Sequence, residues 1–446
     1  MTCISQCGSV STSAPGDFIS VKNIQKVGIS AALAFSLSML ASGQVAFYKI
    51  KVSGSSPNSM TAVNNSGQLV TNIATQTGYD VSLWSRFAGL EKLGLNGVTK
   101  GGTAINSSSE IVGAGDPNQS GVSQAFLWSP GAGTQWLGSL GGRYSAANGI
   151  NDNGAVVGLS YTSAYALHAF LWTQTGGMQD LTPSLTSIGG AAAVGINSSN
   201  QIVGYYFPNG SGNPVGFTWT QQAGLQDLGP AGTLALAVND SGTVVGQAPN
   251  AKGYMHAMSW TPSGGVKDLG TLGGPESKAL GINNKGWIVG TSLTSSGNGM
   301  LHAFLWTPSA GMKDLSVLAG LNKSLQPYWI QVNDFGVIAI STNKGLEEFT
   351  PIMRASATSS VNPSKLGQAV TFTATVKSII GPPPDGETVQ FKMGGNVIGS
   401  GTLRNGVAQF TTSTIPVGSH IVTILYVGDA NYLSNSYSSI TQVVNP

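Results

Sequence analysis

Residues 149–158 read GINDNGAVVG, and residues 281–290 repeat the phrase as GINNKGWIVG. In both stretches an asparagine precedes a short polar turn, and a valine-rich segment that ends in glycine follows. The phrase recurs in varied form along the chain, and its asparagines lie 42 to 50 residues apart: Asn64, Asn106, Asn151, Asn197, Asn239, Asn283 and Asn333. A period of this length is typical of a repeat array. The repeat predicts the architecture, although by itself it names no substrate and no reaction.

Each period contains four strand signals. The first ends at the asparagine, and the second is the valine-rich segment after the turn. The third is an apolar and aromatic run such as Ala169–Trp172, and the fourth contains an Asp-Leu pair such as Asp180-Leu181. The short Asn, Asp and Gly pairs between the strands favour tight hairpin turns. Four antiparallel strands in about 45 residues are typical of one blade of a β-propeller.

The two ends of the array predict how it closes. The seventh period begins at Trp329 and shows three strand signals, because no Asp-Leu strand follows them. A strand-like segment, Phe47–Val52, precedes the first asparagine, where a fourth strand is expected. We therefore predict a seven-bladed propeller in which the N-terminal strand completes the last blade, so that no sheet edge is left free. The asparagine strand is then innermost. An open solenoid and a six-bladed ring are the alternatives.

The array resembles the HAF repeat, named for His-Ala-Phe, of bacterial extracellular proteins. Residues 168–172 and 302–306 both read HAFLW, and residues 268–274 read DLGTLGG. The resemblance covers about residues 45–353, with degenerate first and last copies. It implies secretion and a propeller-like fold, and it implies no established chemistry.

After Met353 the pattern changes. Residues 354–360 are predicted to form a polar linker, and Ala369–Val376 alternates with the period of a strand. About seven short strands in roughly 90 residues predict a β-sandwich. The segment resembles the bacterial Ig-like repeat of surface proteins, on GQAVTFTATV at 367–376 and GSHIVTILYVGDANY at 418–432. This resemblance implies a spacer or adhesion module outside the cell.

The N-terminal segment is predicted to be a secretory signal. Lys22 and Lys26 precede an uncharged, mostly apolar run over residues 27–40, and small residues follow at 41–43. The alternative is an uncleaved anchor, although the run is shorter than the roughly 20 residues of a membrane span. The predicted domains are a signal peptide at 1–43, the propeller at 44–353 and the sandwich at 354–446. Both cysteines, Cys3 and Cys7, precede the apolar run, so the mature chain would lack zinc-thiolate and cysteine-nucleophile chemistry.

Composition narrows the class of protein. Gly accounts for 62 of 446 residues and charged residues for only 9%. This balance suits many short strands and tight turns, and it argues against a helical protein and against a charged disordered one. The formal net charge is +2, and the chain has no basic run. We therefore expect no nucleic-acid partner.

The tryptophans divide into two groups. Those that recur on the third strand are predicted to pack between sheets: Trp84, Trp128, Trp172, Trp219, Trp260 and Trp306. Three others lie outside that register and are candidate ligand contacts. Trp287 occupies a position that is polar or small in most other copies, so we expect it to face solvent. Trp136 replaces the aspartate of an Asp-Leu strand, and Trp329 takes an innermost-strand position where it would plug the central channel.

Other polar residues repeat with the array and are predicted to be structural. His168, His256 and His302 take the same place in different blades, which favours loop histidines over a metal site. The repeated aspartates are expected to accept hydrogen bonds from turn and edge amides, because two catalytic carboxylates must meet at one bond. The sequence contains no nucleophile elbow, zinc-protease or phosphate-loop motif. No cofactor or metal is predicted.

The long loops between the second and third strands are uneven and rich in Ser, Gly, Asn and Tyr, so any ligand site is predicted on that face. We expect a secreted or cell-surface, non-enzymatic binding or adhesion protein. Its expected partner is an extracellular glycan or a surface protein. It would be a monomer with no membrane span after signal cleavage. The alternatives are an extracellular enzyme that acts on polysaccharide and a purely structural surface protein.

Overall fold

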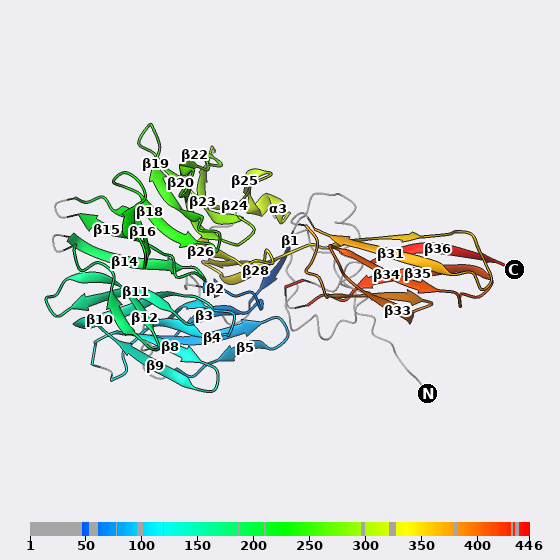
Figure 1. Ribbon diagram of the computed structural model, residues 1–446, viewed down its shortest axis with the longest axis horizontal. Coiled ribbons are helices and arrows are strands. Elements are labelled where there is room, and N and C mark those ends of the chain that lie inside the picture. The colour runs from blue at the N-terminus through cyan, green and yellow to red at the C-terminus, as the bar shows by residue number, and fades with distance from the viewer. Residues whose placement is uncertain are drawn as a thin grey trace, which may run out of the picture.

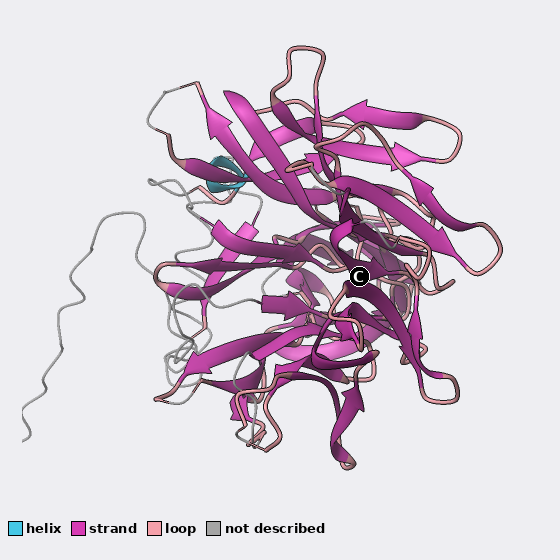
Figure 2. Cartoon of the chain, turned by 90° about the vertical axis from the view of Figure 1, so that its left-hand side faces the viewer, coloured by secondary structure: helices cyan, strands magenta, loops and turns pink. Residues whose placement is uncertain are grey.

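The computed structural model describes most of the chain after residue 46, and it is all-β. The described residues are 47–52, 61–76, 78–95, 101–118, 120–185, 188–208, 211–295, 299–320, 327–378, 381–429, 431–432 and 437–446. Within them, strands dominate and one short helix, α3 (Leu315–Leu318), is seen (Figure 2). This part of the chain contains no helix long and apolar enough to cross a membrane. The predicted signal at 1–43, with Cys3 and Cys7, lies outside the described residues.

Six four-stranded antiparallel sheets follow one another along the chain, each with its strands in sequence order. The first two contain β2 (Thr61–Val63), β3 (Leu69–Ala74), β4 (Tyr79–Ser85), β5 (Gly89–Lys92), and β6 (Gly101–Ile105), β7 (Ile111–Gly115), β8 (Gln124–Ser129), β9 (Gly133–Gly138). The next two contain β10 (Gly141–Ile150), β11 (Val156–Thr162), β12 (Leu167–Thr173), β13 (Gly177–Asp180), and β14 (Ile188–Ile196), β15 (Ile202–Pro208), β16 (Val215–Thr220), β17 (Gly224–Asp227). The last two contain β18 (Leu234–Val238), β19 (Val244–Pro249), β20 (Met255–Thr261), β21 (Gly265–Asp268), and β22 (Gly273–Ile282), β23 (Ile288–Thr294), β24 (Leu301–Thr307), β25 (Gly311–Asp314). Figure 1 shows these sheets succeeding one another around a propeller-like array, from blue through cyan and green to yellow-green.

The remaining sheet of the array joins the two ends of this part of the chain. Its strand order is β1-β28-β27-β26, from β1 (Phe47–Lys51), β28 (Gly345–Pro351), β27 (Ile338–Thr342) and β26 (Pro327–Val332). β1 pairs antiparallel with β28, with Phe47 opposite Pro351 and Lys51 opposite Glu347. The prediction that the N-terminal strand completes the last sheet is therefore confirmed. We call this unit the closing sheet.

The core of the array lies between neighbouring sheets. In one cluster, Val157 and Leu171 of the β10–β13 sheet pack with Ile202 and Phe217 of the β14–β17 sheet. The tryptophans of the third strands belong to these layers. Trp84, Trp172 and Trp219 are buried, whereas Trp128, Trp260 and Trp306 are half-buried. The prediction that they pack between sheets is confirmed.

A close approach of three strands explains why two of the recurring phrases occur together. Gly158 ends the valine-rich phrase on β11 and lies opposite Phe170, the phenylalanine of the His-Ala-Phe phrase. A Cβ atom at Gly158 would lie 2.0 Å from the main-chain oxygen of Ala146 and 2.8 Å from the Phe170 ring. The same contacts recur at Gly204 and Gly290. Only glycine leaves room there for both the innermost strand and the aromatic ring.

The C-terminal sandwich consists of two sheets. One contains β29 (Arg354–Ser359), β31 (Val370–Lys377) and β34 (Val407–Thr412). The other has the order β30 (Ser364–Lys365), β36 (Tyr437–Asn445), β35 (Gly418–Tyr426), β32 (Thr388–Met393) and β33 (Asn396–Thr402). Phe372 and Phe391 pack between the sheets. The predicted β-sandwich is therefore present.

The prediction of a polar linker over residues 354–360 is wrong. β29 pairs with β31 along its whole length, and Ala355 and Ala357 pack against the sandwich core. The small apolar residues alternate with polar ones that face water, which hid a strand with one buried face. Only Ile352 and Met353 separate β28 from β29, and both are buried. The sandwich projects from the side of the array where β1 and β28 lie (Figure 1).

Candidate functional site

The turn after each innermost strand is organised by its asparagine side chain. In the β10–β11 turn, Oδ1 of Asn151 accepts hydrogen bonds from the main-chain N–H groups of Asn153 (3.1 Å) and Ala155 (3.0 Å). Its Nδ2 donates to the main-chain oxygen of Asn197 in the next sheet (2.9 Å). One side chain therefore closes its own turn and binds the neighbouring sheet. Asparagine suits this position because its amide is a donor and an acceptor at once.

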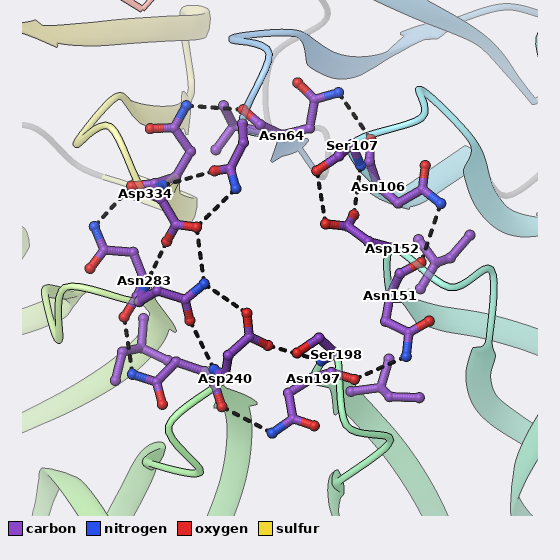
Figure 3. Close-up of a pocket in the computed structure, with 18 of the residues that line it drawn as sticks. Asn64, Asn106, Ser107, Asn151, Asp152, Asn197, Ser198, Asp240, Asn283 and Asp334 are labelled. Carbon is purple, nitrogen blue, oxygen red and sulfur yellow. Dashed lines mark hydrogen bonds between the residues drawn. The ribbon is translucent and has the colours of Figure 1, made fainter. Parts of the chain in front are cut away.

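These inter-sheet bonds form a continuous chain that returns to its start. The Nδ2···O distances are 2.9–3.2 Å, and the donors in order are Asn64, Asn106, Asn151, Asn197, Asn239, Asn283 and Asn333. The last bond runs from Asn333 back to the oxygen of Asn64, across 269 residues of sequence. All of these side chains are buried. We call this set the asparagine ring, and Figure 3 shows it in face view.

The residue after each ring asparagine lines a cavity at the centre of the array. This central cavity has a volume of about 180 Å³. Its inner layer consists of Asn65, Ser107, Asp152, Ser198, Asp240, Asn284 and Asp334. Sequence reasoning did not find the cavity, because each of these residues looks like an ordinary turn residue. The position of these residues in the repeat could have indicated the cavity. The innermost turns of a closed array converge on one axis, even though their residue types vary.

Three carboxylates in this layer bridge neighbouring turns. Asp152 accepts from the main-chain N–H (2.8 Å) and the hydroxyl (2.9 Å) of Ser107. Asp334 accepts from the main-chain N–H of Asn284 at 2.7 Å. Burial raises the pKa of Asp240, but hydrogen bonds from Ser198 and Asn284 outweigh it, and the pKa lies below its usual value. The expectation that these aspartates accept turn amides is confirmed, and charged carboxylates suit a ligand that donates hydrogen bonds.

The histidines of the His-Ala-Phe phrases pair with the aspartates of the Asp-Leu phrases. Nδ1 of His168 lies 2.7 Å from Oδ2 of Asp180, and the pair His302–Asp314 has a distance of 2.8 Å. His256 and Asp268 form the same pair at 2.8 Å. Each histidine lies at the start of a third strand, so the expectation of loop histidines is wrong. No group of three or more His, Cys, Asp or Glu side chains that could hold a metal occurs among the described residues.

Trp287 does not face solvent, and that expectation is wrong. Its side chain is 6% exposed and packs with Val289 and Leu305 in the core beside the closing sheet. The expectation rested on the polar residues that most other sheets carry at this position. Glu110, for example, accepts a hydrogen bond from the ring amide of Asn106 (2.7 Å), so it too faces neighbouring protein.

The other two candidate tryptophans are half-buried. Trp136 packs edge-to-face against Phe126, with ring centroids 6.0 Å apart. In the closing sheet Trp329 pairs with Ser341, and its indole nitrogen is buried with no hydrogen-bond partner in the described part of the chain. Neither tryptophan is among the residues that line the central cavity. A ligand role for either side chain remains a prediction.

Comparison with protein families assigns the C-terminal sandwich. Residues 357–445 match the bacterial Ig-like domain, group 3. The sandwich is therefore called the Ig-like domain below. A search among curated proteins finds no match for the chain.

Solved structures similar to this chain share little sequence identity with it. The streptogramin B lyase structure is 12% identical, covering 69% of this chain and 98% of its own, with a TM-score of 0.45. The β-propeller domain of the Trilobed protease from Pyrococcus furiosus is 9% identical, covering 66% and 94%, with a TM-score of 0.44. A gluconolactonase from Xanthomonas campestris is 10% identical, covering 68% and 89%, with a TM-score of 0.38. These values carry no argument about activity.

The Ig-like domain contacts the asparagine ring where the closing sheet meets the first sheet. Asn431 accepts a hydrogen bond from Nδ2 of Asn333 (2.9 Å) and donates one to the main-chain oxygen of Asn65 (3.0 Å). Tyr432 packs edge-to-face against Phe335, with centroids 6.1 Å apart. The Ig-like domain therefore lies beside the central cavity, on the face of the tight turns. The long loops between second and third strands are at the opposite ends of the sheets.

Proposed function

We propose that the chain is a secreted or cell-surface binding protein without catalytic activity. In this proposal the array is a closed, seven-bladed β-propeller of the HAF-repeat kind that carries the ligand site. The Ig-like domain acts as a spacer or adhesion module that holds the propeller away from the surface. The protein works as a monomer, and its partner is an extracellular glycan or a surface protein.

The asparagine ring supports the proposed blade count. Each ring bond joins one sheet to the next, and the bond from Asn333 to Asn64 joins the last copy to the first. An open solenoid would leave the amide of its last asparagine without this partner. The pairing of β1 with β28 supports the same conclusion, because it covers the edge of β28 and gives the closing sheet four strands like the others.

One observation supports a non-catalytic role. The histidine and carboxylate side chains of the array form hydrogen bonds that hold its sheets and turns in place. The histidines of the array each bind an aspartate of their own sheet. The carboxylates of the central cavity accept hydrogen bonds from the main chain of adjacent turns. Groups that hold the scaffold in each repeat are poorly suited to change protonation during a reaction.

An enzyme that acts on polysaccharide is the second candidate. Glu110 and Asp152 line the same cavity, of about 350 Å³, beside the β10–β13 sheet. A pair of carboxylates in one pocket is what glycoside hydrolysis requires. Both carboxylates are, however, already acceptors of hydrogen bonds, from Ser129 and Ser107 respectively. This engagement favours a structural role.

The test uses the chain from residue 44 onward, applied to a glycan array, to bacterial and host cells and to soluble polysaccharides. We expect saturable binding and no release of reducing ends. Release of reducing ends that Glu110→Gln abolishes would contradict the proposal and support the enzyme. Absence of binding to every glycan and cell type would leave the structural spacer as the better description. Detection of the chain outside intact cells, with a new N-terminus near residue 44, tests the proposed export.

A further inference from the structure

At two positions near the end of the second strand, on the long-loop face, aromatic residues occur in only two adjacent sheets. The ninth and tenth residues after a ring asparagine include Tyr161 on β11 and Tyr206 and Phe207 on β15. In the other copies these positions hold no aromatic residue: Ile73, Ala74, Gly115, Asp116, Ala248, Pro249, Ser292, Leu293, Thr342 and Asn343. A feature found in only two adjacent sheets is not needed to build a sheet. It is therefore a candidate for function.

The tyrosines of these two sheets lie on surfaces that face each other. Val157 of β11 belongs to the core shared with the β14–β17 sheet, and the register of β11 with β12 has no bulge up to Tyr161. Tyr161 therefore lies on the same face of its sheet as Val157. Tyr206 packs against that same core from the opposite sheet. The two side chains approach the same boundary from both sides.

Two further tyrosines lie near Tyr161, one in ring contact with it and one four residues later in the chain. The ring of Tyr144 on β10 packs edge-to-face against Tyr161, with centroids 6.1 Å apart and an interplanar angle of 71°. Tyr165, in the turn between β11 and β12, is 77% exposed. Its φ of 63° is a left-handed conformation that is unfavourable for a bulky residue. Such strain is concentrated at ligand-binding sites. We call Tyr144, Tyr161, Tyr165 and Tyr206 the tyrosine patch.

Polar groups complete the surface. The hydroxyl of Tyr206 lies 3.2 Å from each carboxylate oxygen of Asp227, an exposed residue at the end of β17. Burial and the nearby carboxylate raise the pKa of Tyr206, so its hydroxyl stays protonated at neutral pH. On β14, a Cβ atom at Gly190 would lie 3.4 Å from the Leu167 side chain on β12, so the two sheets approach each other closely there. The patch thus combines ring faces, neutral hydroxyls and one carboxylate acceptor.

We propose that the tyrosine patch binds a neutral saccharide chain, an inference that rests on the proposed binding function and names its ligand class. The apolar C–H face of a sugar ring stacks on an aromatic face, while its hydroxyls donate to a carboxylate and exchange hydrogen bonds with tyrosine hydroxyls. A short apolar peptide offers few donors for the remaining lone pairs of the exposed Asp227 carboxylate, which already accepts from the Tyr206 hydroxyl. A polyanion would be repelled by that carboxylate.

The experiment measures binding of the chain from residue 44 onward to soluble β-glucan, xylan and galactomannan by affinity electrophoresis and calorimetry. A neutral peptide mixture serves as the comparison probe. The test variant is the double substitution Tyr161→Ala and Tyr165→Ala, and the matched control is Tyr328→Ala, an exposed tyrosine of the closing sheet. Thermal melting of each variant checks that it is folded. Tyr161→Phe serves if the double variant does not fold.

We expect at least one neutral polysaccharide to bind the native chain and the double variant to bind it roughly tenfold more weakly, the loss of about 1.4 kcal/mol expected for removing aromatic contacts. The control should bind as the native chain does. Equal binding by native chain and double variant would overturn the patch while leaving the proposed binding function intact. Binding of the peptide mixture alone, or of none of the probes, would also overturn it. Binding to whole cells, measured in parallel, tests the proposed function separately.

Discussion

At the scale of single residues, the ring asparagines have the most demanding role in the array. Each side chain uses Oδ1 to close its turn and Nδ2 to bind the next sheet, and each is buried. A residue that supplies only acceptors or only donors would leave a buried main-chain group without a partner. Such a loss costs about 1–3 kcal/mol, and more when a charge is buried.

The substitution Asn197→Asp tests this role. The new carboxylate cannot donate to the main-chain oxygen of Asn239, now 3.0 Å from Nδ2, and it buries a charge beside another acceptor. We expect the free energy of unfolding to fall by about 2–3 kcal/mol, measured in urea. Asn213→Asp, at an exposed position in the loop between β15 and β16, is the control and should have little effect. A loss no larger than that of the control would contradict the role of the ring.

Substitution of two glycines in the β10–β11 hairpin distinguishes the cost of backbone strain from the cost of steric overlap. Gly154 has a φ of 76° and open space around its Cβ position, with the nearest atom at 3.7 Å. We expect Gly154→Ala to destabilise the protein by about 1–2 kcal/mol, the cost of the left-handed conformation. Gly158→Ala, whose Cβ would overlap a main-chain oxygen at 2.0 Å, should cost more or prevent folding. Unfolding curves that reverse this order would contradict the explanation.

At the scale of the strands, the closing sheet depends on β1. Phe47 is 1% exposed and packs in the core beside Ile330 and Phe349. Lys49 forms a 2.6 Å ion pair with Glu347, and both side chains are largely buried. Without β1, the edge of β28 is unpaired and the Glu347 carboxylate loses this cation.

Removal of β1 should therefore expose an aggregating edge. We expect a chain that starts at residue 53 to aggregate or melt well below a chain that starts at residue 44, measured by size-exclusion chromatography and thermal melting. Both chains keep all other strands, so the comparison isolates β1. Equal elution volumes and melting temperatures would show that closure by β1 contributes little.

At the scale of the whole molecule, the two domains are joined by more than the covalent connection. Arg86 of the first sheet donates to the main-chain oxygen of Asp429 in the Ig-like domain (3.3 Å) and forms a 2.5 Å ion pair with Glu348 of the closing sheet. Together with the Asn431 contacts at the asparagine ring, these bonds connect the first sheet, the closing sheet and the Ig-like domain. They favour a fixed orientation of the Ig-like domain relative to the central cavity.

A carboxyl group near this junction gives the stability a dependence on pH. Burial raises the pKa of Glu387 to about 7 from its ordinary 4.5, although a hydrogen bond from the Tyr426 hydroxyl opposes the shift. Between these values the folded chain binds more protons than the unfolded chain, so stability falls as the pH rises from about 4.5 to about 7. We expect the melting temperature to decrease over this range, and Glu387→Gln to reduce the decrease. Parallel profiles for the native chain and the variant would contradict this assignment.

Local patterns predicted the strands and their order well, because side-chain alternation and turn chemistry act over a few residues. The absence of a fourth strand after Phe349–Met353 was enough to predict that β1 joins the closing sheet. Local patterns misplaced residues whose environment comes from a neighbouring sheet. Trp287 shares its position with polar residues elsewhere, and only the packed core shows that Trp287 is buried while Glu110 at the same position is half-buried.

The sequence by itself determined the repeat, the strand that closes it, the packing of the recurring tryptophans and the Ig-like domain, since each is recorded in spacing or alternation. The tertiary structure decided where the polar residues meet. The asparagine ring and the central cavity bring together side chains that are 42 to 50 residues apart along the chain and 269 residues apart at the closure. It also brought Asn431 beside Asn333 and placed Tyr161 and Tyr206 on sheet faces that point toward each other. Such contacts depend on how the array curves and closes, which no single period contains.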